Sequence, residues 1–502
     1  MARSIITLRA RDPLGVRGGL TAPVKIARVL AVAVLAVGAG LAGASSLDAI
    51  AAIAAVVLLC LYIWYATVRR RNAIVLLFAS LTLVPVYVAP TYRTFSPEPT
   101  AVAALAVALA LFKAGGIIRW TVVDVAFTAT CGTMVLAAWL GPHSLLATGS
   151  ELFLWIPAYL AGRAICRRYN GAETFVLAAV VGGLLALPFI AYETISRHNV
   201  FFGLAKAGSA LTTLWAHPAF RPGGLLRSEG AFGHPLTMAV IIGSCAVFAL
   251  ALAVRAKGRL RQAAWLCGAV ALAIGQYTSH ERSGWTVVIG GVLIFAASAI
   301  PRGARLKNAL IVGVVAIPLC LVAISASEPA NGAAAVARTG STADRLALWR
   351  HALEPGALAL VGWPETVNFN HFANAVHPGQ VAIDSGYLQI GDVFGVIALI
   401  ALFTVVAAVV RVAVAVRGTW AAIIPAVALA DLIALTVIGF QTQLPVFIWL
   451  VVGGASGVEL RRRRSRQEAP TELAEPLAEH SVLQRLGQPA RPASLAARLA
   501  KS

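Results

Sequence analysis

Charged residues are scarce in this chain of 502 residues: Asp, Glu, Lys and Arg make up only 12% of it, and hydrophobic residues make up 59%. A soluble globular domain averages about 25% charged and about 45–50% apolar residues, so this composition excludes a water-soluble enzyme. The mean hydropathy of +0.81 agrees with that exclusion. The class that remains is a polytopic membrane protein.

Cysteine is rare as well, and the positions of the six cysteines exclude two further classes. All six lie in or at the edge of apolar segments, and no Cys-x-x-Cys spacing occurs. A disulfide framework and a structural zinc site both require cysteines grouped in polar sequence. We therefore interpret the cysteines as small residues packed between helices.

The chain is rich in apolar segments of about 20 residues, the length that crosses a bilayer. Their pattern predicts an all-α polytopic membrane protein with about 14 transmembrane helices between residues 26 and 458. Residues 1–25 form a basic N-terminus, and residues 459–502 are predicted to be a basic and then disordered tail. The predicted spans are 26–44, 47–68, 73–90, 100–118, 121–140, 151–166, 172–193, 235–254, 263–279, 284–300, 308–326, 387–410, 419–438 and 443–458.

The basic residues predict the orientation of these helices. Only nine of the 41 Lys and Arg fall on the side opposite the N-terminus. Because Lys and Arg are enriched in cytoplasmic loops, both termini are predicted to be cytoplasmic. The net charge of +20 is then explained by basic residues that keep loops on the cytoplasmic side and attract anionic lipid headgroups. It does not predict nucleic-acid binding.

Two of the loops predicted outside are long, at about 194–234 and 327–386. Such loops are usually functional or disordered, and their aromatic residues favour partly ordered structure. Arg227, Arg282 and Arg345 lie on this side in polar surroundings, where three guanidinium groups could converge on one diphosphate. The other outside basic residues, each interpreted singly as a solvated charge, are Arg93, Arg197, Lys206, Arg221, Arg338 and Arg350.

Four polar motifs follow one another between residues 220 and 410. The first reads Arg-x-x-Gly-x-Phe-x-x-Pro, and the second is a serine-containing turn with one arginine. The third starts a helix with Arg-x-x-x-Trp and adds a glycine element, and the fourth opens the next span and continues into a glycine-rich turn. The motifs are Arg227–Pro235, Ser279–Ser283, Arg345–Trp349 with Gly362-Trp363, and Asp384–Leu388 with Gly391–Gly395.

At these motifs the chain resembles the O-antigen polymerase and O-antigen ligase family of bacterial envelope glycan assembly. The resemblance implies a membrane glycosyltransferase that joins undecaprenyl-diphosphate-linked oligosaccharide repeats into a surface polysaccharide. The reaction would take place on the outer face of the bacterial inner membrane without a cofactor. The implied partners are the lipid-linked donor, a sugar-hydroxyl acceptor and membrane lipids, and a chain-length regulator is a further candidate.

Two departures from the family pattern bear on the choice within it. Pro364 replaces the second glycine of a Gly-x-Gly element, and Asp384 occupies a position that ligases often fill with histidine. The second departure favours the polymerase over a ligase that transfers the glycan to a lipid A-core or another acceptor. A transporter or flippase for the lipid-linked oligosaccharide is the second alternative, although it would place charge at the midplane. A cell-wall glycan polymerase and a non-enzymatic scaffold account for the motifs less well.

The chemistry of such a transfer predicts roles for the polar residues. Preorganised cations stabilise a departing diphosphate, so Arg227, Arg282 and Arg345 are predicted to clamp the leaving group. Asp384 is predicted to be the base, because a carboxylate at the mouth of a span gains basicity by partial desolvation. Its structural alternative is a helix N-cap. The other candidate bases are Glu229, Glu281, His371 and His377, and the predicted substrate-binding residues are Glu229, His234, Glu281, Trp349, His377 and Tyr387.

Metal-dependent transfer is not predicted, because no Asp-x-Asp pair occurs in the outside loops. Three acidic residues lie within predicted spans, and intramembrane carboxylates are functional candidates. Asp124 lies close to the cytoplasmic end of its helix and is interpreted as interfacial. Asp392 lies one to two turns below the outer surface and could orient an arginine, whereas Asp431 lies deeper and receives no role.

Overall fold

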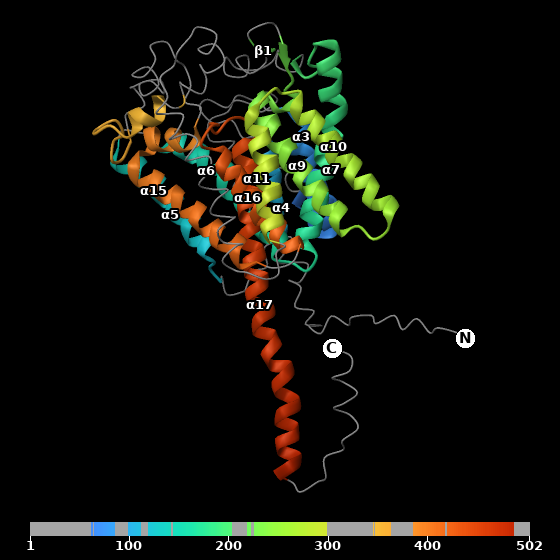
Figure 1. Cartoon of the computed structure of the whole chain (residues 1–502). Helices are drawn as coiled ribbons and strands as arrows, with labels where there is room; N and C mark the ends of the chain where they lie inside the picture. Colours follow the sequence, from blue (N-terminus) through green and yellow to red (C-terminus); the bar gives the residue numbers. More distant parts are fainter. Residues whose placement is uncertain are drawn as a thin grey trace, which may run out of the picture.

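The structure is a computed structural model that describes residues 62–63, 65–85, 99–111, 119–141, 144–202, 218–221, 225–298, 345, 347–362, 385–416 and 419–485. Helices dominate this part of the chain (Figure 1). The elements are α3 (Arg70–Leu83), α4 (Pro99–Leu111), α5 (Val122–Leu140), α6 (Leu145–Cys166), α7 (Gly171–Ser196), β1 (Ala219–Arg221), β2 (Leu225–Arg227), η3 (Gly230–Phe232), α9 (Pro235–Arg255), α10 (Arg259–Tyr277), α11 (Arg282–Ser298), α15 (Gly386–Ala415), α16 (Thr419–Ala434) and α17 (Leu444–Arg485).

Six of the described helices are long and apolar enough to cross a membrane: α5, α6, α7, α9, α15 and the first part of α17, Leu444–Ser465. Three shorter apolar helices fall in α4, α11 and α16. The predicted class, an all-α multi-pass membrane protein, is confirmed. The number of about 14 spans stays a prediction, because the spans at 26–44 and 308–326 lie outside the described residues.

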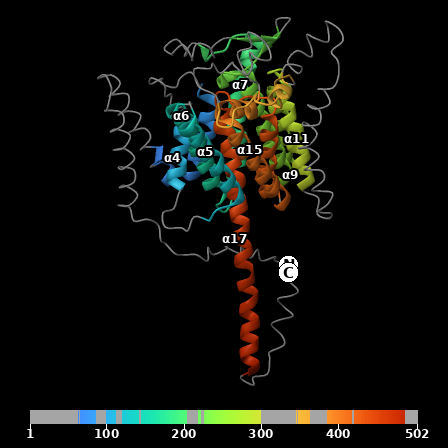
Figure 2. The ribbon, with the colours of Figure 1, turned by 90° about the vertical axis from the view of Figure 1, so that its left-hand side faces the viewer.

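The helices run back and forth between two ends of a bundle (Figures 1 and 2). We call the end that carries the antiparallel strands β1 and β2 the hairpin end, and the end from which α17 projects the tail end. Arginines at the tail end cap helices: Arg167 and Arg168 each donate from Nη2 to the Leu111 carbonyl oxygen (3.2 and 2.9 Å). The partial negative charge at such a helix C-terminus stabilises cationic side chains. Which end faces the cytoplasm stays a prediction.

α6 and α17 cross inside the core of the bundle, to which most of the described helices contribute. Trp155 and Trp449 are fully buried there, with ring centroids 4.7 Å apart. Small residues allow the close approach, because a Cβ atom at Gly162 would lie 1.9 Å from the Leu450 carbonyl oxygen. Figure 2 shows α4, α5 and α6 to one side of α17 and α9 and α11 to the other.

The cysteines agree in part with their predicted packing role. Cys131, Cys166 and Cys245 are buried free thiols inside the bundle, whereas Cys267 on α10 is exposed. The remaining two cysteines lie outside the described residues. Cys245 also shows why its neighbour must be small, since a Cβ atom at Gly183 would lie 2.9 Å from the Cys245 Cβ atom.

The C-terminal segment is described as far as Arg485. Within the predicted basic and then disordered tail of residues 459–502, α17 continues as one helix to Arg485 (Figure 1), and residues 486–502 lie outside the described residues. Ala, Glu, Leu and Arg are among the strongest helix formers. A helix that continues from a transmembrane segment has already met the cost of nucleation, so these residues can extend it.

Candidate active site

The first motif connects β2 to α9 at the hairpin end. β2 ends at Arg227, η3 follows, and His234 caps α9 by accepting a hydrogen bond at Nδ1 from the Leu236 N–H (3.1 Å). Gly230 and Gly233 have φ of 58° and 65°. This is the left-handed region that glycine adopts without steric cost. The motif therefore folds into a sharp reversal that leads directly into the helix.

The second motif forms the turn between α10 and α11, and its own hydrogen bonds fix its shape. Ser279 Oγ donates to the Gln276 carbonyl oxygen (2.7 Å) and accepts from the Glu281 N–H (3.1 Å). Gln276 Nε2 donates in turn to the Glu281 carbonyl oxygen (3.2 Å). His280, between them, has a left-handed φ of 54°. The backbone of Glu281 is thus held at the tip of the turn.

The two motifs meet in an ion pair between Arg227 and Glu281. The side chain of Arg227 is 22% exposed and that of Glu281 is 8% exposed, so the pair is shielded from water and its attraction is stronger than at a surface. The Ser228 N–H donates to the Thr278 carbonyl oxygen (3.2 Å) and aligns the two segments. The structure therefore brings together two of the residues predicted for the site.

Glu193, near the end of α7, adds a buried carboxylate that the sequence analysis missed. Its Oε2 accepts from the backbone N–H groups of Glu229 (3.1 Å) and Gly230 (2.7 Å). Its Oε1 accepts from Asn199 Nδ2 (3.1 Å), and the same amide donates to the Gly230 carbonyl oxygen (2.8 Å). The three N–H donors thus occupy both oxygens of this carboxyl group and hold it against the first motif. A signal existed: an acidic residue ends the predicted span 172–193, directly before the long outside loop that contains the first motif.

Glu229 and His234, both predicted to bind substrate, are neutral at physiological pH. Burial raises the pKa of Glu229 to about 9, together with the nearby charge of Glu193, and Arg227 offsets part of the effect. Burial, and then the positive charge of Arg227, lowers the pKa of His234 to about 3. The hydrogen bond that His234 accepts at Nδ1 also requires a neutral ring.

The third and fourth motifs meet at the start of α15. Trp349, in a helical turn at 347–352, donates from Nε1 to the Thr436 carbonyl oxygen (3.2 Å). Ser385 donates from Oγ to the Leu435 carbonyl oxygen (3.2 Å). Both residues therefore bind the connection between α16 and α17.

The same connection reaches the first motif. Gln443 Nε2 donates to the Ala231 carbonyl oxygen in η3 (3.0 Å), and Thr442 Oγ1 donates to Thr237 Oγ1 on α9 (2.8 Å). All four motifs thus have residues at the hairpin end of the bundle. Arg282 begins α11 and is exposed, and Arg345 is half-buried, so convergence of the three arginines on one ligand stays a prediction.

The glycine elements of the third and fourth motifs form a break in α15. Gly395 leaves the helical conformation with φ of 86°, and there the Val396 N–H donates to the Ala359 carbonyl oxygen (3.0 Å). Gly362 also has φ of 86°, and a Cβ atom on it would lie 2.0 Å from the Val393 carbonyl oxygen. Only glycine fits both positions. The two elements, apart in sequence, are one structural feature.

Asp384, the predicted base, and His377 and His371 lie outside the described residues. The structure does decide one alternative. Ser385 is the N-cap of α15, because its Oγ accepts from the Leu388 N–H (3.4 Å). The N-cap role considered for Asp384 therefore belongs to its neighbour, since the helix begins one residue earlier than the predicted span.

Other predicted substrate-binding residues already have protein partners. Tyr387 is buried and donates from its hydroxyl to the Leu432 carbonyl oxygen (2.8 Å). Trp349 donates to the α16–α17 connection, and Glu281 pairs with Arg227. These contacts position the ends of helices, and contact with substrate stays a prediction for all three residues.

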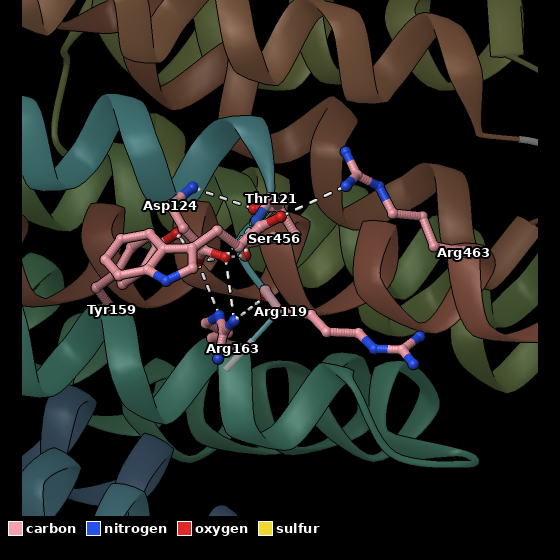
Figure 3. Close-up of polar contacts among 8 residues, drawn as sticks. Arg119, Thr121, Asp124, Tyr159, Arg163, Ser456 and Arg463 are labelled. Carbon is pink, nitrogen blue, oxygen red and sulfur yellow. Dashed lines mark hydrogen bonds and ion pairs between the residues drawn. The ribbon is translucent and has the colours of Figure 1, made fainter. Parts of the chain in front are cut away.

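A second polar cluster lies at the tail end around Asp124 (Figure 3). Arg163 donates to its two carboxylate oxygens from Nε (2.8 Å) and Nη2 (3.0 Å). The hydroxyls of Tyr159 (2.6 Å) and Ser456 (2.8 Å) and the Thr121 N–H (2.7 Å) also donate to it. Asp124 is buried and joins α5, α6 and α17, and its interfacial position in the membrane stays a prediction.

The other two intramembrane acids differ from Asp124 in their partners. Asp431 is fully buried on α16 and accepts from Ser244 Oγ on α9 (2.7 Å). Asp392 is buried on α15, one turn before the break, and in the described part of the chain its Oδ1 has no hydrogen-bond partner. The prediction that it orients an arginine stays untested.

Comparison with known proteins adds no family to this picture, because no family model and no curated protein matches the chain. Within the described residues, no group of three or more His, Cys, Asp or Glu is arranged to hold a metal ion. The basis for assigning a function is therefore the geometry of the hairpin end together with the order of the four motifs.

Proposed function

We propose that this chain is a membrane glycosyltransferase that joins undecaprenyl-diphosphate-linked oligosaccharide repeats into a polysaccharide. The observation that carries the proposal is the ion pair of Arg227 and Glu281. The pair holds a shielded guanidinium at the hairpin end of the bundle, close in sequence to the starts of α9 and α11. The order of the four motifs supports the same reaction.

The reaction requires positive charge where the leaving group becomes negative. When a sugar hydroxyl attacks the anomeric carbon, the lipid diphosphate departs as an anion that a preorganised cation stabilises. Arg227 supplies a planar fork for two phosphate oxygens. Glu281 holds that fork in place before the donor binds, so little reorganisation is needed during transfer.

Asp384 removes the proton from the acceptor hydroxyl in this proposal. It directly precedes Ser385, which caps α15 at the hairpin end. The described candidates suit this role less well. Glu281 is committed to Arg227, and Glu229 retains its own proton at neutral pH. His234 accepts a backbone hydrogen bond at Nδ1.

The substitution Arg227→Lys tests the proposal, because lysine keeps the charge and loses the planar fork. We expect the rate of polymer formation to fall by about 10²–10³-fold, as when a transition-state donor is removed, at an unchanged protein level. Arg197→Lys is the matched control, since Arg197 is exposed at the end of α7. Polymer formation by Arg227→Lys at the control rate would contradict the proposal.

Exchanging the two charges of the ion pair tests whether the pair serves the transfer reaction or only the folding of the two segments. The double variant Arg227→Glu with Glu281→Arg keeps an ion pair between the same two positions but moves the guanidinium to the other motif. We expect a protein level close to that of the unmodified chain and no polymer. Polymer from the exchanged pair would show that the pair only holds the two segments together.

The polysaccharide of a deletion strain distinguishes the two activities of the resembled family. Loss of a polymerase leaves single repeats at the cell surface. Loss of a ligase instead leaves finished polymer stranded on undecaprenyl diphosphate. We expect single repeats, because Asp384 stands where ligases often have histidine.

Transport of the lipid-linked oligosaccharide is the second candidate, and two observations favour it. α15 is broken at Gly395, and Asp431 is fully buried inside the bundle. Transporters often place broken helices and intramembrane charges at the substrate path. Loss of a flippase would leave lipid-linked repeats on the cytoplasmic face of the membrane. Locating these repeats in membrane vesicles of known orientation from a deletion strain therefore separates this candidate from the polymerase.

A further inference from the structure

Glu229 is a buried carboxyl group that the proposed transfer has not yet used. It is 2% exposed, between β2 and η3, and its backbone N–H donates to Glu193 (3.1 Å). In the part of the chain that the structure describes, its Oε1 has no hydrogen-bond partner. A buried carboxyl oxygen without a partner is costly, so its presence at a proposed binding site points to a ligand.

The charges around Glu229 come from four elements. α7 contributes Glu193, β2 ends with Arg227, the α10–α11 turn contributes Glu281, and His234 stands between η3 and α9. Among the described residues, Arg227 is the cation of this set, and Glu281 already balances it. His234 is neutral.

An ionised Glu229 would therefore add a second buried anion beside Glu193. The groups that donate hydrogen bonds to Glu193 are neutral amides, so none of them supplies a positive charge that could also stabilise an ionised Glu229. Two carboxylates without a shared cation cannot both ionise cheaply. The pKa of Glu229, raised to about 9 by burial and then by Glu193, agrees with this geometry.

We propose that Glu229 keeps its proton at neutral pH and donates it in a hydrogen bond to a phosphate oxygen of a bound diphosphate. Glu193 is the positioning residue, because it binds the backbone N–H groups of Glu229 and Gly230, and its charge adds to the effect of burial in keeping Glu229 protonated. The inference rests on the proposed function in naming the donor's diphosphate as ligand. An ionised Glu229 would repel the same anion, whereas the neutral acid attracts it.

The first experiment measures the proton directly and does not depend on turnover. Infrared difference spectra of full-length protein in nanodiscs, with and without Glu229→Gln, report the C=O stretch of a protonated carboxyl. We expect the Glu229 band at pH 7 and its loss as the pH rises through about 9. Glu173→Gln, at an exposed position on α7, should remove no such band. Absence of the band at pH 7 would overturn the proposal.

The second experiment measures binding of inorganic pyrophosphate by calorimetry between pH 7 and pH 10. For the unmodified chain, we expect the Kd for pyrophosphate to rise about tenfold per pH unit above the pKa of Glu229, because only the form with protonated Glu229 binds it. Glu229→Gln carries a permanently neutral donor, so this additional rise should disappear. Ionisation of pyrophosphate itself is common to both proteins. An equal rise in both would overturn the proposal.

Glu193→Gln tests the positioning role and does not alter Glu229. Removing the neighbouring charge should move the loss of the infrared band, and of pyrophosphate affinity, to lower pH. A purely structural role would lower the protein level and leave both pH profiles in place. This variant also keeps the inference testable if Glu229→Gln does not fold.

The source of the diphosphate is distinguished with farnesyl diphosphate in the same nanodiscs. A lipid-linked ligand predicts tighter binding than that of inorganic pyrophosphate, and equal binding would overturn the assignment to a lipid-linked donor. The outcomes also separate the two proposals. A normal infrared titration with unaffected polymer in Arg227→Lys contradicts the proposed function alone. Reduced polymer in Arg227→Lys with an ionised Glu229 contradicts this inference alone.

Discussion

At the scale of single residues, nearby donors decide the ionisation of the acidic groups at the hairpin end. Glu281 faces a guanidinium, Glu193 faces three amide N–H groups, and Glu229 faces neither; burial, and then the charge of Glu193, raises the pKa of Glu229 to about 9. Burial, and then the positive charge of Arg227, keeps His234 neutral.

His234 gives a prediction for stability against pH. Its pKa falls from about 6.5 to about 3 on folding, so the folded state binds fewer protons than the unfolded state between these values. Its contribution to stability is therefore present above about pH 6.5 and lost as the pH falls toward about 3. His234→Asn keeps a side-chain acceptor for the cap and cannot be protonated.

Thermal unfolding of full-length protein in detergent at pH 7 and pH 5 checks this prediction. We expect the Tm of the unmodified chain to fall more between pH 7 and pH 5 than the Tm of His234→Asn. His198→Asn, at an exposed position beyond α7, is the control and should behave like the unmodified chain. An equal loss in all three proteins would mean that His234 does not carry the acid sensitivity.

Sequence alone predicts the residues of this site unevenly. Arg227 and Glu281 belong to short polar motifs beside span ends, so they stand out in an apolar chain. Glu193 does not stand out, because it ends a span and gains its role only when the first motif folds back onto α7. The charge of Glu229 depends on that same contact, which no spacing in the sequence encodes.

At the scale of elements, the crossing of α6 and α17 gives a packing prediction. A Cβ atom at Gly162 would lie 1.9 Å from the Leu450 carbonyl oxygen, so Gly162→Ala must push the helices apart. Overpacking of this kind costs typically about 1–3 kcal/mol. Gly149→Ala, on the same helix, has no atom within 4 Å of its new Cβ and should be neutral or slightly stabilising.

Folded yield and Tm of the two alanine variants check the packing prediction. We expect Gly162→Ala to have the lower Tm at an equal level of synthesis. Because both changes are glycine to alanine in α6, helix propensity is the same and only the contact differs. A Tm for Gly162→Ala as high as that for Gly149→Ala would mean that the crossing can relax at no cost.

The buried pair of Asp124 and Arg163 gives a second prediction for these elements. Removing one partner of a buried pair leaves an uncompensated charge and typically costs about 3–5 kcal/mol. We expect Asp124→Leu and Arg163→Met each to lower the Tm sharply. The double variant should lose less than the sum, because no buried charge is left. Thermal unfolding of all four proteins measures this coupling, and additive losses would contradict it.

Element positions were predictable, and element ends were less so. The apolar runs predict α5, α7 and α9 within a few residues, because hydropathy reports what lies in lipid. α6 begins at Leu145, before the predicted span at 151, because Ser144 Oγ accepts from the Leu146 and Ala147 N–H groups and caps it. Caps are local polar contacts that a hydropathy average does not resolve.

At the scale of the whole molecule, alternation of the helices places the four motifs at one end. Hydropathy predicts that alternation, but it does not predict which helix ends are neighbours. Trp349, Ser385 and Gln443 show which contacts hydropathy does not predict, because through them the connection between α16 and α17 binds the third, fourth and first motifs. The second motif joins this group through the ion pair of Arg227 and Glu281. Contacts of this kind arise from helix packing, which the small residues of the bundle permit.

The last prediction concerns the orientation of this molecule in the membrane. Basic residues gather at the tail end, and cytoplasmic loops are enriched in Lys and Arg, so the tail end should face the cytoplasm. Reporter fusions should be cytoplasmic after the basic clusters and outside in the two long loops. The cytoplasmic fusion points are Arg71, Arg168, Arg261, Lys307, Arg417 and Arg464, and the outside ones are Ala207 and Gly340.

The two kinds of reporter must give opposite and complementary signals at each fusion point, for example alkaline phosphatase outside and a fluorescent protein inside. Fusions at Arg168 and Arg464 test the tail end, because both arginine clusters contact described helices there. The fusion at Gly340 tests the loop that leads to Arg345. If that loop were cytoplasmic, the hairpin end would face the compartment where lipid-linked repeats are made, before they are flipped outward. Polymerisation outside would then be excluded, and transport would become the better proposal.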